Sequence, residues 1–318
     1  MKFAAFTLLM LIALATPASA IEVVCSVPDL TPIVKAVGGE IVNVTSVMPP
    51  GSDPHAFSIS METMERLGNA DLIVLANSKL LHFEEKIKEN YGEKCIDFED
   101  YAAFGAKLDS FPGYDENPHG YWLKFENGVA IARAVEAKLS SILPEYAWYF
   151  EGNLEEFEKE VAEAKRIIRS AAAEQGIEGK ACVAAVPGVC YIIQNSGMEV
   201  DAVLLAEGLG FVSGKDLAEI VEKLKSSEYV CIVVPEFMKN SKAGEIARQI
   251  SADTGKPVIY VKFVMVGEDD SYTGLQYFNA LRFSGLSYTK AEKSSGYTFI
   301  TAVAACAVAL AVLGRIRR

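Results

Sequence analysis

The sequence predicts an α/β protein with two lobes, each built on a parallel sheet, joined by a long linking helix and followed by a C-terminal transmembrane helix. Short β-rich runs alternate with helical stretches along most of the 318 residues, an order typical of parallel sheets with helices on both faces. A charged amphipathic segment separates two such series. An uncharged stretch near the C-terminus is close to the length that crosses a bilayer.

The two series of strands predict an N-terminal lobe over residues 21–142 and a C-terminal lobe over residues 177–284. In the first lobe the expected strands are 22–27, 41–48, 71–76 and 95–98, with helices that include 30–37 and 58–67. In the second lobe the expected strands are 181–186, 200–206, 229–234 and 258–264, with helices that include 214–225 and 243–254.

The segment between the lobes, residues 143–176, predicts the linking helix. It has no proline after Pro144 and, up to residue 175, no glycine after Gly152. Apolar side chains recur at helical spacing, and charges occupy the other face; the apolar positions are Leu154, Phe157, Val161, Ala164 and Ile168. A helix of this length would act as a strut that limits hinge motion and leaves a cleft between the lobes.

The two ends predict export and anchoring. Residues 1–20 have the basic start, apolar stretch and small-residue cleavage site of a secretory signal. A polar stalk over 285–296 leads to the uncharged stretch 297–314, expected to be a transmembrane anchor, and to a basic cytoplasmic tail over 315–318. The sequence thus predicts an exported protein tethered in the cytoplasmic membrane by its C-terminus.

Charge and cysteine content narrow the classes of partner. The formal net charge is −12, which opposes nucleic-acid binding because that function uses a basic face. Outside the expected anchor there is no CxxC pair, so a structural zinc site is not indicated. Export permits disulfides, but the pairing of these cysteines cannot be read from the sequence; they are Cys25, Cys95, Cys182, Cys190 and Cys231.

Two of the three histidines lie where a cleft between α/β lobes would bind a ligand. His55 follows the second expected strand and His119 follows the fourth, and ligands bind at the carboxyl ends of strands in open α/β sheets. Asp270 follows the last strand of the second lobe. Two imidazoles and a carboxylate predict a site for zinc, or for manganese. Asn117 or Asp53 could orient a histidine ring through a hydrogen bond.

Other polar residues on these loops have more ordinary explanations. His82 lies on an expected helix and is interpreted as a packing or surface residue. Glu207 and Glu236 also follow strands of the second lobe, where they could cap a helix as readily as bind a ligand.

The loops that carry these residues resemble those of a known family, the zinc/manganese substrate-binding proteins of ABC importers, often called cluster A-I. Residues 50–55, PGSDPH, are similar to the family's first-ligand loop, and residues 117–123, NPHGYWL, to its second. Residues 143–153 resemble the start of its linking helix. Asp270-Ser271-Tyr272, followed by Asn279, resembles its last ligand loop. The likeness extends over nearly the whole segment between the two ends.

The resemblance implies that the protein is a receptor and not an enzyme. It would capture a divalent metal, zinc ahead of manganese, as the transported ligand and deliver it to the permease of an ABC transporter. The implied metal ligands are His55, His119 and Asp270.

One position departs from the family pattern. Val186 occupies the place of the family's third ligand, a histidine or glutamate, and valine cannot coordinate a metal. Either water, Cys190 or Glu207 completes the site, or the site has lost affinity for metal. The departure also leaves open a receptor of the same fold for a metal chelate or other small molecule. A zinc-dependent hydrolase is a further alternative, although no HExxH helix or nucleophile elbow is present. A surface adhesin is a further alternative.

Overall fold

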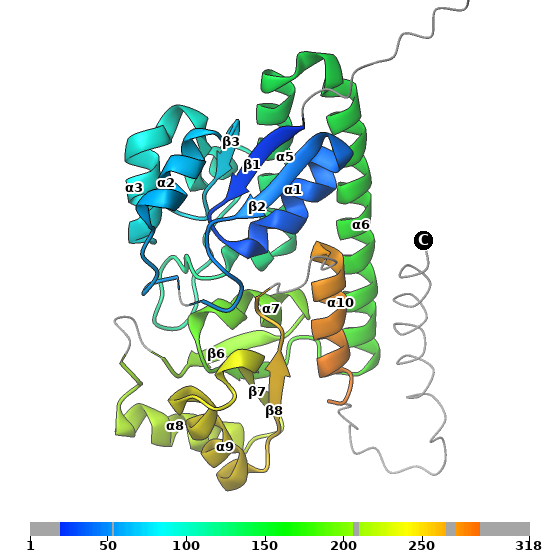
Figure 1. Ribbon diagram of the computed structural model, residues 1–318. Coiled ribbons are helices and arrows are strands. Elements are labelled where there is room, and N and C mark those ends of the chain that lie inside the picture. The colour runs from blue at the N-terminus through cyan, green and yellow to red at the C-terminus, as the bar shows by residue number, and fades with distance from the viewer. Residues whose placement is uncertain (1–19, 53, 206–209, 265–270, 287–318) are drawn as a thin grey trace, which may run out of the picture.

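The computed structural model describes residues 20–52, 54–205, 210–264 and 271–286. Two α/β lobes lie one above the other, and one long helix runs beside both (Figure 1). Each lobe is built on a four-stranded parallel sheet, in the order β2-β1-β3-β4 in the first lobe and β6-β5-β7-β8 in the second. The two-lobe arrangement with parallel sheets therefore agrees with the predicted architecture.

The first sheet is formed by short strands whose inward side chains are almost wholly apolar. Its strands are β1 (Ile21–Cys25), β2 (Val42–Ser46), β3 (Leu72–Val74) and β4 (Cys95–Ile96). The helices of this lobe are α1 (Thr31–Gly38), α2 (Met61–Gly68), α3 (His82–Tyr91), α4 (Phe98–Ala103) and α5 (Phe125–Ile142). Helices α2 and α3 lie on one side of the sheet, and α1 and α5 on the other (Figure 1).

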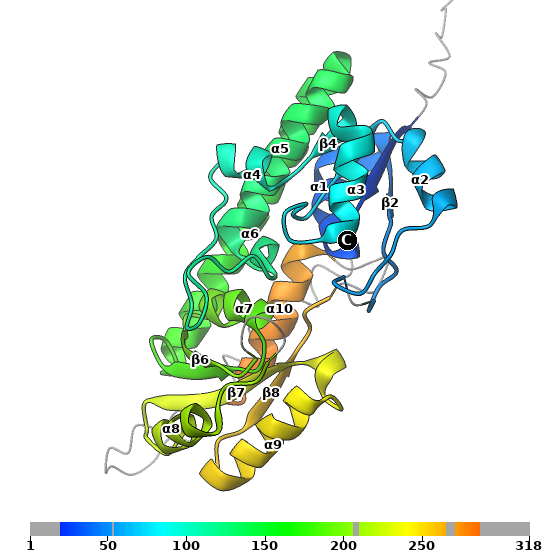
Figure 2. The same ribbon diagram turned by 90° about the vertical axis from the view of Figure 1, so that its left-hand side faces the viewer.

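The second sheet has a longer and completely buried central strand, β7. Its strands are β5 (Ala181–Ala184), β6 (Glu199–Val203), β7 (Tyr229–Pro235) and β8 (Val258–Val261). The helices are α7 (Cys190–Asn195), α8 (Gly214–Leu224), α9 (Lys242–Thr254) and α10 (Tyr272–Phe283). Helices α8 and α9 cover the outer side, whereas α7 and α10 lie toward the long helix (Figures 1 and 2).

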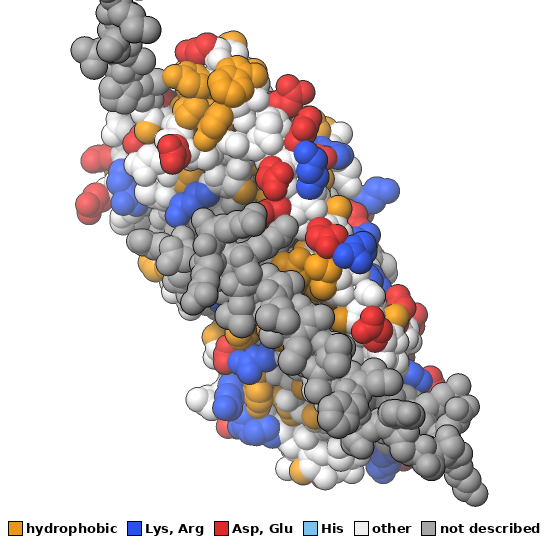
Figure 3. All heavy atoms as spheres, turned by 90° about the vertical axis from the view of Figure 1, so that its right-hand side faces the viewer, with side chains coloured by type: hydrophobic (Ala, Val, Ile, Leu, Met, Phe, Trp, Pro, Cys, Tyr) orange, Lys and Arg blue, Asp and Glu red, His pale blue; other side chains and the backbone are white. Residues whose placement is uncertain are grey.

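The predicted linking helix is present as α6 (Ala147–Glu174), which begins after a 3-10 turn at Pro144–Tyr146. Its buried side chains include Phe157, Val161, Ala164 and Ile168, all members of the predicted apolar stripe. The sequence analysis did not predict helix α5 as an element of its own. In the structure α5 packs along α6, and the two helices form a pair. On this side of the molecule acidic and basic side chains are interspersed (Figure 3).

Helix α10 returns from the second lobe and ties the two lobes together. Tyr272, its first residue, packs against Phe157 with ring centroids 5.6 Å apart. The Tyr272 hydroxyl lies 2.9–3.1 Å from the carbonyl oxygens of residues 122–124. Asn195 of α7 donates to the carbonyl of Leu123 at 2.7 Å. These buried polar contacts fix the boundary on which the candidate site lies.

The predicted C-terminal transmembrane helix is wrong as part of this fold. In the described ranges, no helix is both long enough and apolar enough to cross a membrane. The two longest helices, α5 and α6, fail for a physical reason: each carries charges on the face turned away from its apolar stripe. The stretch 297–314, on which the prediction of an anchor rested, lies outside the described residues, as do the expected signal 1–20, except Ala20, and the tail.

Candidate metal centre

The structure brings the two predicted histidines together. His55 lies on the loop that follows β2, and His119 lies on the loop that precedes the 3-10 turn at Tyr121–Leu123. Their ring centroids are 5.5 Å apart with the planes tilted by 48°. Two imidazoles bound to one zinc ion at ordinary N–metal distances and tetrahedral angles have centroids roughly 5 Å apart. The spacing therefore suits a shared metal ion.

Asn117 orients the ring of His119. Asn117 is fully buried, and its amide nitrogen donates to the carbonyl of Pro187 at 2.9 Å. Its Oδ1 accepts from the backbone N–H of His119 at 3.0 Å and lies 3.1 Å from His119 Nδ1. Because that oxygen can only accept, Nδ1 carries the proton and donates. The Nε2 atom of His119 is then left with the lone pair that a metal requires.

Burial keeps His119 neutral. Desolvation, and then the neighbouring His55, lowers the pKa of His119 to about 4, because both disfavour the imidazolium form. The ring is therefore neutral at pH 7. Tyr114 packs edge-on against it with centroids 5.9 Å apart, and its hydroxyl donates to the carbonyl of Leu205 in the second lobe. Sequence reasoning missed Tyr114, since it stands in an irregular loop with no pattern to mark it.

The second lobe meets the His119 loop at residues 186–188. Gly120, directly after His119, has φ of +69°. A Cβ atom at Gly120 would lie 2.8 Å from the ring of Phe263 and 2.9 Å from the carbonyl oxygen of Gly188. No side chain fits there, so the backbones of the two lobes approach closely. Val186 is nearly buried, with 8% of its surface exposed, and precedes the Pro187 carbonyl that holds Asn117.

The structure does not support Cys190 as a replacement for the missing third ligand. The other polar residues that were considered as ligands are engaged elsewhere or lie outside the described residues. Cys190 is fully buried at the start of α7, and burial raises the pKa of its thiol well above the usual range. Glu236 forms an ion pair with Arg282 at 3.2 Å. His82 is exposed on α3, 3.0 Å from Glu85. Asp53, Glu207 and Asp270 lie outside the described residues.

No third ligand joins the two histidines among the residues whose positions are described: these contain no cluster of three histidine, cysteine, aspartate or glutamate side chains suited to a metal. Ser271, the first described residue after Asp270, caps α10 by accepting from the N–H of Gly274 at 3.0 Å. The next residue is Tyr272, which contacts the carbonyls of residues 122–124. The described end of this loop therefore lies beside the segment that follows His119.

We expect replacement of Asn117 by alanine to weaken metal binding by about tenfold to a hundredfold, because the residue that orients a ligand histidine contributes on this scale. Metal titration of the purified variant is the measurement. Asn195→Ala is a matched control, since Asn195 is also a buried asparagine that bridges the lobes but contacts neither histidine. Equal losses in both variants would show that Asn117 acts only on the fold.

One family of known proteins matches nearly the whole described part of the chain. The family model, described as "Zinc-uptake complex component A periplasmic", matches residues 23–284. The chain belongs to this family. The predicted resemblance to cluster A-I receptors is thereby confirmed, and with it the functional class: a substrate-binding protein of metal importers of the ABC type.

Individual members of the family are distant from this chain in sequence. A manganese ABC transporter substrate-binding lipoprotein, PsaA of Streptococcus mitis, is 22% identical over 274 residues, covering 83% of this chain and 86% of that protein. A zinc-bound crystal structure of a ZnuA deletion mutant has a TM-score of 0.71 at 18% identity and covers 85% of this chain and 99% of the other.

A manganese-bound point mutant of a periplasmic metal-binding protein from candidatus liberibacter asiaticus has a TM-score of 0.67 at 18% identity. It covers 84% of this chain and 100% of the other. These structural likenesses show the fold.

Proposed function

We propose that this protein captures a divalent metal ion at the boundary between its lobes, zinc ahead of manganese, and passes it to the permease of an ABC importer. The ligands are His55, His119 and Asp270. The observation that carries the proposal is the pair of imidazoles with centroids 5.5 Å apart, one of them held with its Nε2 available by Asn117.

The preference for zinc rests on ligand chemistry. Two imidazoles and one carboxylate suit zinc in a tetrahedral site, whereas manganese favours a larger share of oxygen ligands. The related proteins do not decide between the two metals, since one relative is named for manganese and one related structure contains zinc. The low pKa of His119 favours either metal, because the neutral ring already offers the lone pair of Nε2 and need not release a proton to bind at neutral pH.

The proposed place of action is outside the cytoplasm. The family model is described as periplasmic, and relatives are named as lipoproteins, in line with the secretory signal expected over residues 1–20. Membership of a family of transport receptors points away from enzymatic activity, and function then lies in binding and release.

Calorimetric titration of the metal-free protein with zinc and with manganese tests the proposal. We expect one equivalent to bind, zinc the more tightly. Absence of saturable binding of either ion at micromolar concentrations would overturn it. Native mass spectrometry of protein purified from its host addresses the alternative of a metal chelate, which the valine at position 186 favours; an added organic mass would support that alternative.

Position 186 offers a gain-of-function prediction. Val186 lies one residue from the carbonyl that binds Asn117, and in relatives of this kind the corresponding position is expected to supply a ligand. Replacement by glutamate would add a fourth ligand and complete a tetrahedron, so we expect zinc affinity to rise by about tenfold or more. Val186→Leu, which adds no ligand, is the control. A folded Val186→Glu protein with unchanged affinity would show that position 186 does not face the metal.

A further inference from the structure

Three sulfur atoms lie close together in the core of the second lobe. Cys182 of β5 and Cys231 of β7 are both fully buried, and their Sγ atoms lie 3.5 Å apart. The thioether sulfur of Met198, just before β6, lies 3.4 Å from the Cys182 sulfur. Two more cysteines are fully buried in the described part of the chain; they are Cys25 on β1 and Cys190 at the start of α7.

The backbone holds the two cysteines as direct neighbours across the sheet. Strands β5 and β7 are paired in parallel, with Cys182 and Cys231 as register partners. Adjacent strands are roughly 5 Å apart, which falls within the Cα separation of about 4.4–6.8 Å that a disulfide spans. Both side chains therefore leave neighbouring positions of one sheet and reach the same face, where their sulfur atoms meet.

The ladder is irregular at this point. The β5–β7 register shifts between Ala181 and Cys182, and the β5–β6 register shifts between Cys182 and Val183. A regular parallel ladder holds the side chains of paired residues side by side, and a local irregularity lets one of them turn toward its partner. The sulfur atoms would need to close by about 1.5 Å to reach the S–S bond length of about 2.05 Å.

We propose that Cys182 and Cys231 form a disulfide bond that links the two central strands of the second lobe. The two thiols lose two protons and two electrons to a small-molecule disulfide such as oxidised glutathione. One thiolate first attacks that disulfide and releases one reduced thiol. The second cysteine then displaces the other, so that one protein S–S bond forms, the S–S bond of the oxidant is broken and two reduced thiols leave.

The bond forms before the sheet is complete. In the folded protein burial raises the pKa of the Cys231 thiol well above its usual range, so little thiolate is available there. During folding both thiols are still open to the oxidant. Once buried beside Met198, the bond is shielded from thiolate attack and resists reduction.

The bond would stabilise the part of the second lobe that faces the candidate metal site. The bond joins residues that are 49 positions apart. Closing a loop of this size lowers the conformational entropy of the unfolded chain and so stabilises the folded state. The carboxyl end of β5 leads directly to residues 186–188, which contact the His119 loop. The bond itself contributes no metal ligand, so its effect is on stability.

Thiol counting on the full chain tests the proposal. The protein is refolded with mixed oxidised and reduced glutathione, unfolded again without reductant, treated with iodoacetamide and weighed by mass spectrometry. We expect two cysteines to escape alkylation, and a peptide pair containing Cys182 and Cys231 that is lighter by two hydrogens than the two free peptides. Alkylation of every cysteine, or linkage through Cys25, Cys95 or Cys190 instead, would overturn the proposal.

Thermal unfolding provides a second readout. Protein refolded in the presence of reductant is expected to have a Tm about 5–15 °C below that of the oxidised protein, and this shift should vanish in the Cys182→Ala, Cys231→Ala double variant. Cys190→Ala, which removes another fully buried cysteine, should keep the shift. A redox-dependent shift that persists in the double variant would also contradict the bond. If the double variant does not fold, thiol counting on the unmodified chain still decides.

Discussion

Replacing both His55 and His119 by alanine is expected to abolish metal binding. Loss of a group that merely orients a ligand already weakens binding by about tenfold to a hundredfold, so loss of a ligand itself should weaken it by more than about a hundredfold at each position. Their ring centroids are 5.5 Å apart, close enough to share one ion. Direct titration with zinc, and competition with a coloured chelator, measure the loss.

His82→Ala is the matched control for this experiment. It removes the remaining histidine, which is exposed on α3 and pairs with Glu85, and should leave affinity unchanged. Circular dichroism and thermal unfolding of each variant separate lost binding from lost folding. If the double variant is folded and still binds zinc with wild-type affinity, the site lies elsewhere.

The pairing of His55 with His119 could be predicted because it depends on a general property of the fold. The carboxyl ends of parallel strands meet at one edge, so loops far apart in sequence come together there. The alternation of strands and helices was enough to place both histidines on that edge. The role of Asn117 followed from its position two residues before His119.

The contacts made by irregular segments could not be predicted. Tyr114 reaches both His119 and the second lobe from a loop with no periodicity, and its place depends on packing between lobes. Helix α5 was missed because its buried face is wide and includes small residues such as Ala130 and Ala134, so no clear stripe marks it. The contact between Cys182 and Cys231 depends on strand order and register, which pattern alone does not give.

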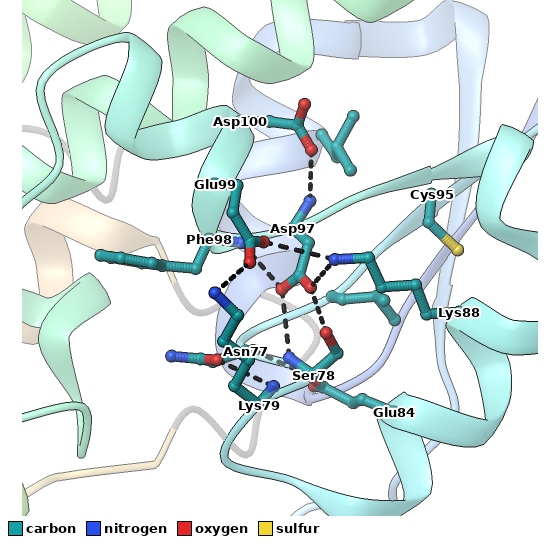
Figure 4. A network of polar contacts seen from close by, with 12 residues as sticks. Asn77, Ser78, Lys79, Glu84, Lys88, Cys95, Asp97, Phe98, Glu99 and Asp100 are labelled. Carbon is teal, nitrogen blue, oxygen red and sulfur yellow. Dashed lines mark hydrogen bonds and ion pairs between the residues drawn. The ribbon is translucent and has the colours of Figure 1, made fainter.

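Removal of the carboxylate of Glu84 is expected to cause a large loss of stability in the first lobe. Glu84 is fully buried on α3, and its oxygens accept from the backbone N–H groups of Ala76 at 2.9 Å and Asn77 at 2.7 Å. Glu84 and Asn77 belong to the network of polar contacts drawn in Figure 4. The carbonyl of Ala76 in turn accepts from the hydroxyl of Tyr121, two residues after His119. Glu84 therefore supports the β3 loop against which the His119 loop is anchored.

We expect Glu84→Ala to lower the free energy of unfolding by about 1–4 kcal/mol. The buried N–H of Asn77 loses its acceptor, at about 1–3 kcal/mol, and the N–H of Ala76 keeps only the hydroxyl of Ser26 at 3.1 Å. Denaturant titration measures the change. Glu85→Ala alters the next residue of the same helix, which is exposed, and should change stability by no more than about 1 kcal/mol. Similar losses in both variants would show that the amides of residues 76 and 77 do not depend on Glu84.

Glu84 is also expected to make the stability of the protein depend on pH. Burial, opposed by hydrogen bonds from Ser26, Ala76 and Asn77, raises the pKa of Glu84 from 4.5 to about 7. Between pH 4.5 and about 7 the unfolded chain has already released the proton of Glu84, while the folded protein retains it. The stability that this group contributes is therefore fully present below pH 4.5 and is lost as pH rises through about 7.

The variant Glu84→Gln removes this titration. The difference in unfolding free energy between wild type and Glu84→Gln, measured by denaturant titration from pH 5 to 8, should therefore fall as pH rises and level off above about 7. A difference that stays constant would mean that Glu84 is ionised in the folded protein throughout this range, with its charge fully stabilised by the amides it accepts from.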